Sequence, residues 1–171
     1  ILAMVSLPDF DLNRLNASTP GQRFNRAALA VYEMGSTFKT FTAAAALDAG
    51  VVRLDGGYDA TNPIRVARFV IRDSHAQARW LSVPEIFMYS SNIGAAKMAM
   101  DIGTERQRAF LDRLGLLSPL EIEIPEIGMP MVPVPWREIT TMTVAYGHGI
   151  AVSPVHMAAG VAALVNGGIK R

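Results

Sequence analysis

The sequence predicts a mostly α-helical fold with a few short strands. Helix start and stop signals recur along the chain, whereas segments rich in β-branched residues are few and short. Half of the 171 residues are hydrophobic and 18% are charged, against about 25% charged residues in a typical domain. This composition supports one sizeable core, and the length suits one domain or part of a larger one.

Composition also excludes several classes of protein. Sixteen Lys and Arg against fifteen Asp and Glu give a net charge of +1, which excludes a strongly basic nucleic-acid binder. The absence of Cys excludes disulfide scaffolds, thiol nucleophiles and Cys-ligated zinc. His75, His148 and His156 show no metal-ligand spacing, and we expect His148 and His156 to be hydrogen-bonded in the core.

The N-terminal part of the chain is expected to contain one long helix. Residues 1–6 form a short apolar run that looks like the end of a strand, and 23–32 is compatible with a short helix. Residues 36–49 carry the clearest helical signal, because Ser36 suits the N-cap or first turn and an alanine-rich run follows it. Gly50 stands where a left-handed residue commonly ends a helix.

The remainder is expected to be helical apart from one irregular hairpin at 64–72 and a proline-rich loop at 119–135. Capping residues, a proline in the first turn and terminal glycines mark the helix boundaries, with Thr104 as one expected cap. Further helices are predicted over residues 82–88, 92–101, 105–114, 136–146 and 153–165.

Residues 139–169 contain no Asp, Glu, Lys or Arg, and this uncharged run is long enough to span a bilayer. Turn and cap signals at 146–149 and at Ser153-Pro154 interrupt this run, so we expect two buried helices with a bend. The first five residues lack a preceding basic segment and do not read as a signal peptide.

Ser36 and Lys39 form the first candidate for chemistry. Ser36 is the one Ser followed by Lys three positions later, and only three of the basic residues are Lys. Positions i and i+3 share a helix face, so the amine reaches the hydroxyl, and the helix N-terminus favours an oxyanion. A buried Lys loses its proton more easily and then serves as a general base for a Ser nucleophile. The alternative is a capping Ser beside a surface Lys.

Ser90 and Asn92 form the second candidate, within the segment Tyr89–Gly94. Ser and Asn are both capping residues, so this pattern is also typical of an ordinary helix start. In a functional interpretation, the hydroxyl relays a proton and the carboxamide binds a substrate peptide group on the far wall of a cleft.

Together the two motifs and their flanks resemble class B penicillin-binding proteins of the division type. Residues 33–42 are similar to the Ser-x-x-Lys segment of that family, and 83–97 are similar to its Ser-x-Asn segment. Residues 7–13 resemble its Pro-x-Phe-x-x-Asn loop, and 145–168 resemble the helix before its last catalytic strand. The resemblance runs from end to end in the same order, and it implies the α/β fold of penicillin-binding transpeptidases and serine β-lactamases.

The resemblance implies a peptidoglycan D,D-transpeptidase that cross-links stem peptides through a serine acyl-enzyme and is a target of β-lactam antibiotics. Ser36 would be the nucleophile and Lys39 the base, a role that is disputed for this class of motif. Ser90 would pass a proton to the leaving nitrogen, and Asn92 would bind the substrate amide and steady Lys39. The resemblance implies no metal and no organic cofactor.

The family resemblance also sets expectations about place and partners. It implies cell-wall synthesis at division, with effects on cell shape, on the periplasmic face of the inner membrane. The membrane would be reached only through an N-terminal anchor that this chain lacks, and the fragment itself would be soluble. Peptidoglycan stem peptides and β-lactams are the expected partners, together with division or cell-wall synthesis proteins, and nucleic acid is not.

The chain departs from the family at its third motif, Lys-Thr-Gly or Lys-Ser-Gly, which is absent from the sequence. In the family, that strand supplies a cationic group and one N–H group of the oxyanion hole, and losing one such donor costs about 10²–10³ in rate. We therefore expect residues 1–171 to be a partial transpeptidase domain, namely its helical part plus one strand edge. We expect penicillin to acylate it weakly or not at all.

Three other interpretations stay open at this point. A β-lactamase-like hydrolase uses the same Ser-x-x-Lys start but needs a device that activates water for deacylation. A penicilloyl-binding sensor or a division-partner module shares the motifs without catalysis. An unrelated helical domain with chance motifs would account for each motif singly.

Overall fold

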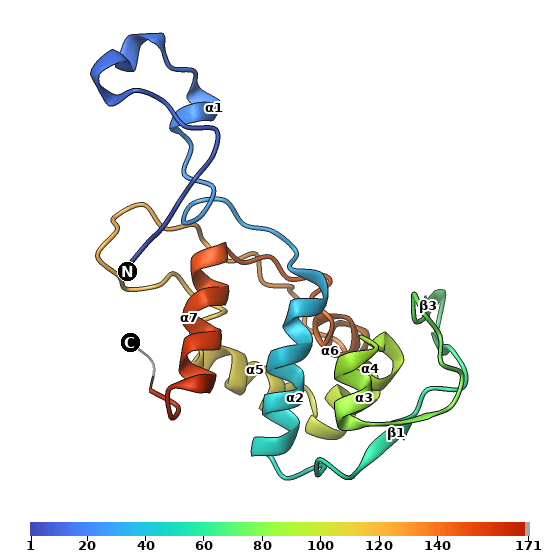
Figure 1. The fold of residues 1–171 in the computed structure, drawn as a ribbon. Coiled ribbons are helices and arrows are strands. Elements are labelled where there is room, and N and C mark those ends of the chain that lie inside the picture. The colour runs from blue at the N-terminus through green and yellow to red at the C-terminus, as the bar shows by residue number, and fades with distance from the viewer. Residues whose placement is uncertain (170–171) are drawn as a thin grey trace.

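The computed structural model describes residues 1–169 and confirms a mostly helical chain with a few short strands. The elements in chain order are η1 (Leu12–Ala17), α1 (Pro20–Arg23), η2 (Gly35–Phe38), α2 (Lys39–Asp48), β1 (Gly57–Asp59), β2 (Ile64–Val66), β3 (Phe69–Ile71), β4 (Trp80–Ser82), α3 (Val83–Met88), α4 (Asn92–Ile102), α5 (Thr104–Arg113), α6 (Glu138–Val144) and α7 (Pro154–Val165). Figure 1 shows helices α2–α7 gathered in one body, from which the N-terminal segment with α1 projects as an arm.

The long helix predicted at 36–49 is present and begins with a tighter first turn. Residues Gly35–Phe38 form the 3₁₀ turn η2, and α2 continues directly from it. Phe38 and Phe41 are almost fully buried, and their rings meet edge to face at 5.3 Å between centroids. Gly50 has φ +64°, as expected for a left-handed residue at the end of the helix. The start of this helix is therefore fixed in the core by aromatic packing.

Helix α4 occupies the middle of the helical body and packs against both α2 and α6. Small residues along it allow this close approach, since Gly94, Ala95, Ala96 and Ala99 are all buried. An added Cβ at Gly94 would run into the side chain of Ile86 on α3. The N-terminus of α4 is consequently held at a defined place beside α2.

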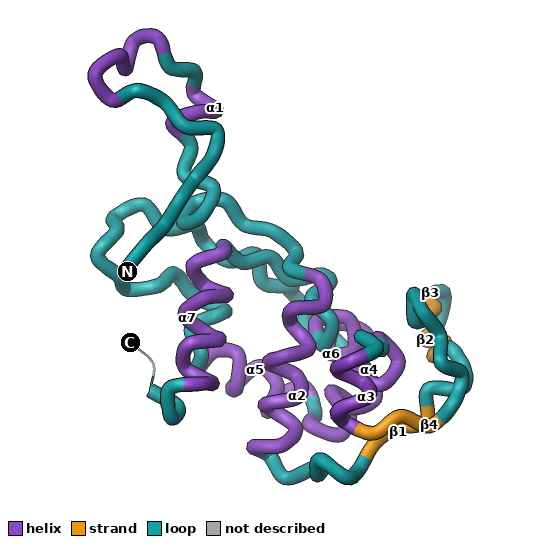
Figure 2. The backbone as a smooth tube through the Cα atoms, viewed as in Figure 1, coloured by secondary structure: helices purple, strands orange, loops and turns teal. Residues whose placement is uncertain are grey.

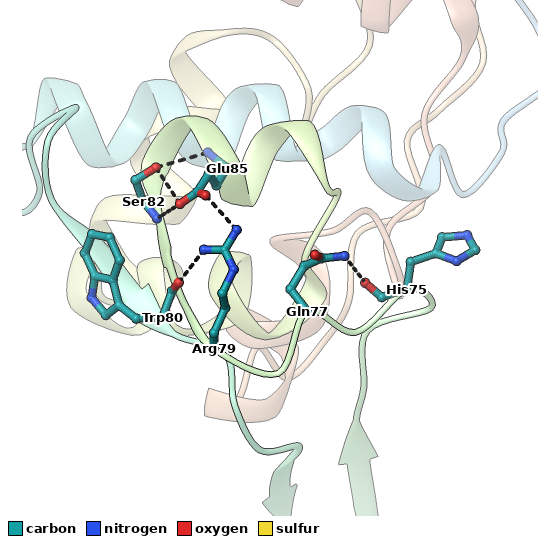
Figure 3. A network of polar contacts seen from close by, with 6 residues as sticks. All are labelled: His75, Gln77, Arg79, Trp80, Ser82 and Glu85. Carbon is teal, nitrogen blue, oxygen red and sulfur yellow. Dashed lines mark hydrogen bonds and ion pairs between the residues drawn. The ribbon is translucent and has the colours of Figure 1, made fainter.

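A reciprocal cap defines the start of α3 and is drawn in Figure 3. The Ser82 hydroxyl accepts a bond from the Glu85 backbone N–H, and the Glu85 carboxylate accepts one from the Ser82 N–H at 2.9 Å. Arg79 also donates to Glu85 at 2.7 Å, and this hydrogen bond is the main cause that lowers the Glu85 pKa to about 2. The predicted helix at 82–88 thus begins as its sequence indicates.

The strands form two separate antiparallel pairs at one edge of the molecule (Figure 2). The pair β2–β3 is the irregular hairpin predicted at 64–72, with Val66 opposite Phe69. The pair β1–β4 was not predicted, because each strand has three residues and no alternating pattern. Gly57 in β1 lies so close to β4 that a Cβ would overlap the carbonyl oxygen of Leu81.

Three local predictions were wrong. Residues 1–6 form no strand, since no described segment pairs with them, and the short helix lies at Pro20–Arg23 rather than within 23–32. A capping box between Thr19 and Gln22 starts that helix. Thr104 is the first residue of α5 rather than its cap, and its hydroxyl bonds the Thr141 hydroxyl at 2.7 Å.

The uncharged run at 139–169 forms two helices joined by a turn, as predicted: α6 without its first residue, and the whole of α7. The expectation that both helices are buried is wrong for α7, in which only His156, Gly160 and Ala163 are buried. Ser153 caps α7 by accepting a bond from the His156 N–H. Among the described residues, no helix combines the length and the apolar character that crossing a bilayer requires.

His156 is a fully buried, hydrogen-bonded histidine, as predicted. Its Nε2 lies 3.1 Å from the Ser118 carbonyl oxygen, which only accepts, so Nε2 carries the proton. Its Nδ1 then accepts from the Ser153 hydroxyl at 2.7 Å. Burial lowers the His156 pKa below its usual 6.5, so the ring is neutral in the folded protein at neutral pH.

The free energy of unfolding is expected to decrease as the pH falls through 6.5, because the unfolded chain binds a proton at His156 that the folded chain does not. The His156→Gln variant should lose this part of the pH dependence. Urea denaturation of both proteins between about pH 7.5 and 5.5 measures the difference in slope. Equal slopes would contradict a neutral buried His156.

Candidate active site

The backbone before Ser36 is fixed by a glycine-containing turn from the far end of the sequence. The Gly35 N–H donates to the Gly147 carbonyl oxygen at 3.2 Å, and Tyr32 and Val152 exchange two backbone hydrogen bonds at 2.9 and 3.0 Å. A Cβ at Gly147 would overlap the Gly35 carbonyl oxygen, so this approach requires glycine. The backbone that leads to Ser36 is therefore held in place by hydrogen bonds with residues 147–152.

Glu33 adds a side-chain contact to the same junction. Its carboxylate accepts the Gly149 N–H at 2.9 Å and contacts His148 Nδ1 at 2.8 Å. The expectation that His148 lies in the core is wrong, because its side chain is 65% exposed. Gly147 and Gly149 both have positive φ, and this turn places His148 at the surface beside Glu33.

The amine of Lys39 contacts the side chains of the other three predicted site residues. Its Nζ lies 2.9 Å from Ser36 Oγ, 2.9 Å from Ser90 Oγ and 2.7 Å from Asn92 Oδ1. Ser36 and Lys39 lie one helical turn apart on η2 and α2, as their spacing predicts. The structure thus brings both motifs together around one amine.

The Ser90–Asn92 turn has an unusual backbone that its neighbours hold in place. Ser90 has φ +55°, a left-handed conformation that is uncommon for a residue with a side chain. Asn92 Nδ2 donates to the Arg72 carbonyl oxygen at 2.9 Å, which turns its Oδ1 toward Lys39. Ser91 caps α4, and its hydroxyl also bonds Asp73 at 2.8 Å.

The electrostatic environment of Lys39 favours loss of its proton. The residue is only 3% exposed, and this burial lowers its pKa from 10.5 to about 8, while the Asp73 carboxylate acts in the opposite direction. The Tyr146 ring lies 5.9 Å from Nζ, and burial raises the pKa of its phenol, so Tyr146 is uncharged at neutral pH. Near neutral pH a measurable fraction of Lys39 is therefore the free amine.

The three contacts of Lys39 determine which oxygens its charged and its neutral amine can bond. An ammonium has three N–H donors, and three oxygens receive them here. A neutral amine has two N–H donors and one lone pair, so two oxygens stay bonded while the lone pair faces the third group. Because Ser36 and Ser90 carry hydroxyl protons and Asn92 Oδ1 does not, the lone pair is directed to a serine.

A groove of about 600 Å³ opens beside this cluster. Ser36 and Ser90 are exposed, whereas Lys39 is buried beneath them. The walls are polar on the α2 side and apolar on the side of α3 and α7, and they consist of Ser36, Thr37, Lys39, Thr40, Phe87, Met157, Ala158 and Val161. Within residues 1–169, no group of three or more His, Asp or Glu side chains gathers as metal ligands would.

The profile of one protein family matches the chain over residues 1–171, and that family is described as the penicillin-binding protein transpeptidase domain. The chain belongs to this family. The α/β fold class expected from the resemblance is confirmed.

Curated relatives match the chain over essentially its whole length. The probable peptidoglycan D,D-transpeptidase FtsI of Caulobacter vibrioides is 42% identical over 171 residues. The probable peptidoglycan D,D-transpeptidase PenA of Neisseria gonorrhoeae is 32% identical over 171 residues, and FtsI of Escherichia coli K12 is 28% identical over 173. These alignments cover 99–100% of the chain but only 29% of each relative.

Two solved structures with the same fold are from Burkholderia species. The transpeptidase domain of penicillin-binding protein 3 from Burkholderia pseudomallei superposes with a TM-score of 0.77 at 29% identity, over 83% of this chain and 44% of that one. A peptidoglycan glycosyltransferase from Burkholderia ambifaria also gives a TM-score of 0.77 at 29% identity, over 82% of this chain and 45% of that one.

Sequence reasoning missed the residues that orient this candidate site. Arg72 acts through its backbone carbonyl, which no residue pattern reveals. Asp73 and Glu33 lie in irregular segments, so no periodicity indicated that Asp73 bonds Ser91 or that Glu33 bonds Gly149. The two glycines at positions 147 and 149 indicated a tight turn. They did not indicate that this turn contacts Gly35.

Proposed function

We propose that this chain carries the serine acyl-transfer site of a peptidoglycan D,D-transpeptidase. The observation that carries the proposal is the bonding of one buried amine, Lys39 Nζ, to Ser36, Ser90 and Asn92. A hydroxyl in contact with a depressed-pKa amine is the arrangement that an activated serine nucleophile requires. The names of the relatives, peptidoglycan D,D-transpeptidases, agree with this chemistry.

In the proposed reaction, the lone pair of Lys39 takes the Ser36 proton while Ser36 Oγ attacks the carbonyl carbon of a D-Ala-D-Ala peptide bond. The C–N bond then breaks, Ser90 passes its proton to the leaving nitrogen and takes up the proton that Lys39 had accepted, and the terminal D-Ala departs. Asn92 binds the substrate amide and keeps Lys39 in place. An amine of a neighbouring stem peptide next attacks the carbonyl carbon of the Ser36 ester. The bond between that carbon and Ser36 Oγ breaks, the cross-link forms, and a proton from the amine returns to Ser36 Oγ. β-Lactams enter the same first step as acylating agents.

We propose that the 171 residues are the part of the transpeptidase domain that holds two of the three family motifs. Two observations support this: the chain spans 29% of the length of each of the three curated relatives named above, and its sequence contains no Lys-Thr-Gly or Lys-Ser-Gly. In the whole protein, a strand with that motif would complete the groove beside Ser36 and supply an oxyanion donor.

The cellular role is part of the same proposal. The FtsI names of two relatives support a role in cross-linking the cell wall at division, with stem peptides as substrates and division proteins as partners. Such a role places the domain at the periplasmic face of the inner membrane, held there by an anchor elsewhere in the protein.

Labelling with a fluorescent penicillin tests the function. The whole protein that contains these residues should form a covalent adduct at Ser36, located by mass spectrometry of the peptide, and Ser36→Ala should form none. An adduct on another residue, or an undiminished adduct in Ser36→Ala, would contradict the assignment. The half-life of the adduct separates the enzymes, since a transpeptidase ester persists and a hydrolase releases it quickly.

The 171-residue chain assayed in parallel tests the domain proposal. It should react at least about 100-fold more slowly than the whole protein, because the loss of one oxyanion donor alone costs that much. Rapid stoichiometric labelling of the 171-residue chain would show that the third motif is dispensable.

A further inference from the structure

We propose that Asp73 is a positioning residue of this site, because it holds the Ser90–Asn92 turn against Lys39. Neither the sequence motifs nor the proposed reaction uses this residue. The inference deepens the proposed function because it concerns the same Lys39, but its readout requires no acylation.

Asp73 accepts two hydrogen bonds from residues on either side of Asn92. Its Oδ2 accepts from the Ser91 hydroxyl at 2.8 Å, and its Oδ1 accepts from the Ile93 N–H at 2.9 Å. Ser91 is 1% exposed, so this contact lies largely out of solvent. The two donors flank Asn92 in the chain, and thus Asp73 fixes the backbone on both sides of the carboxamide that bonds Lys39.

The preceding residue, Arg72, makes a further contact with the same turn. Arg72 accepts from Asn92 Nδ2 through its carbonyl oxygen at 2.9 Å. Residues 72 and 73, which follow β3, therefore bind the side chains of Ser91 and Asn92 and the backbone of Ile93. The positive φ of Ser90 makes this support necessary, because a non-glycine residue held in the left-handed region costs about 1–2 kcal/mol.

Asp73 also occupies a favourable electrostatic position. A carboxylate at the first turn of the 11-residue helix α4 meets free N–H groups and the positive end of the helix dipole. Of the groups that face Lys39, Ser36, Ser90 and Asn92 are uncharged, and the Tyr146 phenol keeps its proton because burial raises its pKa. Asp73 is the charged group that acts on the Lys39 pKa, which its attraction raises against the larger effect of burial.

These two effects have opposite consequences for catalysis. Removing the Asp73 charge should lower the Lys39 pKa further and increase the fraction of free amine. Removing its hydrogen bonds should loosen the Ser90–Asn92 turn. A purely structural role predicts only the second effect, so the titration of Lys39 separates the two.

Nuclear magnetic resonance of ¹³C-labelled lysine gives this titration directly. The chain contains only three Lys, and Lys97→Arg and Lys170→Arg assign the remaining signal to Lys39. In Asp73→Asn the midpoint of Lys39 should shift to lower pH by about half a pH unit, the effect of a unit charge several ångströms away in a mostly aqueous medium. Asp73→Glu, which keeps the charge, should restore most of the shift.

Two further variants serve as controls. Asp112→Asn changes the net charge equally at an exposed position on α5 and should leave the Lys39 midpoint unchanged. Ser91→Ala removes one hydrogen bond of Asp73 without removing its charge and should shift the midpoint much less than Asp73→Asn does.

The proposal is overturned if the Lys39 midpoint in Asp73→Asn stays within about 0.1 pH unit of that of the unsubstituted chain, or if Asp112→Asn shifts it equally. Asp73→Ser, a neutral residue that still accepts a hydrogen bond at a helix start, gives the same comparison if Asp73→Asn does not fold. Failure of penicillin to label Ser36 would contradict the proposed function and would leave this titration unaffected.

Discussion

Lys39→Met is expected to slow acylation of Ser36 by about 10²–10⁴-fold, the usual contribution of a positioned general base. Methionine has nearly the same length and fills the same buried space on α2, but it offers no lone pair to the Ser36 hydroxyl. Stopped-flow measurement of the second-order rate with a fluorescent penicillin, on the whole protein, gives the ratio.

Lys97→Met is the matched control for this variant. Lys97 donates to the Asp59 carbonyl oxygen at 2.6 Å, away from Ser36, so its loss should change the acylation rate little. Lys39→Arg should fail to restore the rate, because a guanidinium keeps its proton at every pH of the assay. Undiminished acylation in Lys39→Met would exclude Lys39 as the base.

The same role predicts the pH dependence of acylation. Burial lowers the Lys39 pKa to about 8, so the reactive free amine predominates above that pH and its fraction falls tenfold per pH unit below it. The rate should therefore rise with pH and level off above about 8. A rate that is independent of pH between about 6 and 9 would contradict proton transfer to Lys39.

Gly147→Ala is expected to have the largest effect on the geometry of the site. The new Cβ would overlap the Gly35 carbonyl oxygen, and Gly147 has φ +76°, which side chains rarely adopt. Overpacking and backbone strain together should lower the free energy of unfolding by about 3 kcal/mol. Because Ser36 follows Gly35, a shift of about 1 Å there should slow acylation by about 10².

Gly149→Ala is the matched control, because it introduces the backbone strain of a positive φ without the overlap of Cβ with a neighbouring atom. Gly149 also has positive φ, +80°, but the nearest atom to its added Cβ is Thr143 Oγ1 at 3.6 Å. Its cost should therefore be about 1 kcal/mol, with little change in acylation. Urea denaturation and penicillin labelling of both variants test the comparison, and equal effects would show that the contact with Gly35 is unimportant.

The local parts of the site could be predicted from the sequence. The spacing of Ser36 and Lys39 determines their contact once the segment is helical, and the alanines that follow make it so. The convergence of Lys39 with Ser90 and Asn92 is a tertiary contact, and the family resemblance, rather than any local pattern, was what indicated it.

The rest depends on packing that no short segment encodes. The left-handed Ser90 is imposed by contacts with residues 72 and 73, which lie beyond the reach of a turn propensity. His148 was misplaced because apolar neighbours in the sequence do not reveal which way a turn points a side chain. Strands β1 and β4 are too short for a periodic signal, and they form because each supplies the other with hydrogen-bonding partners.

The junction between Glu33 and the 148–149 turn joins positions separated by 115 and 116 residues. A chain leaving the ribosome exposes Ser36 and Lys39 long before Gly147 and His148 have been made. Until then, the segment preceding the nucleophile lacks its anchor, and contacts so distant in sequence form late. Newly synthesised protein should therefore lack a fixed conformation of the segment before Ser36 until translation has passed residues 147–149.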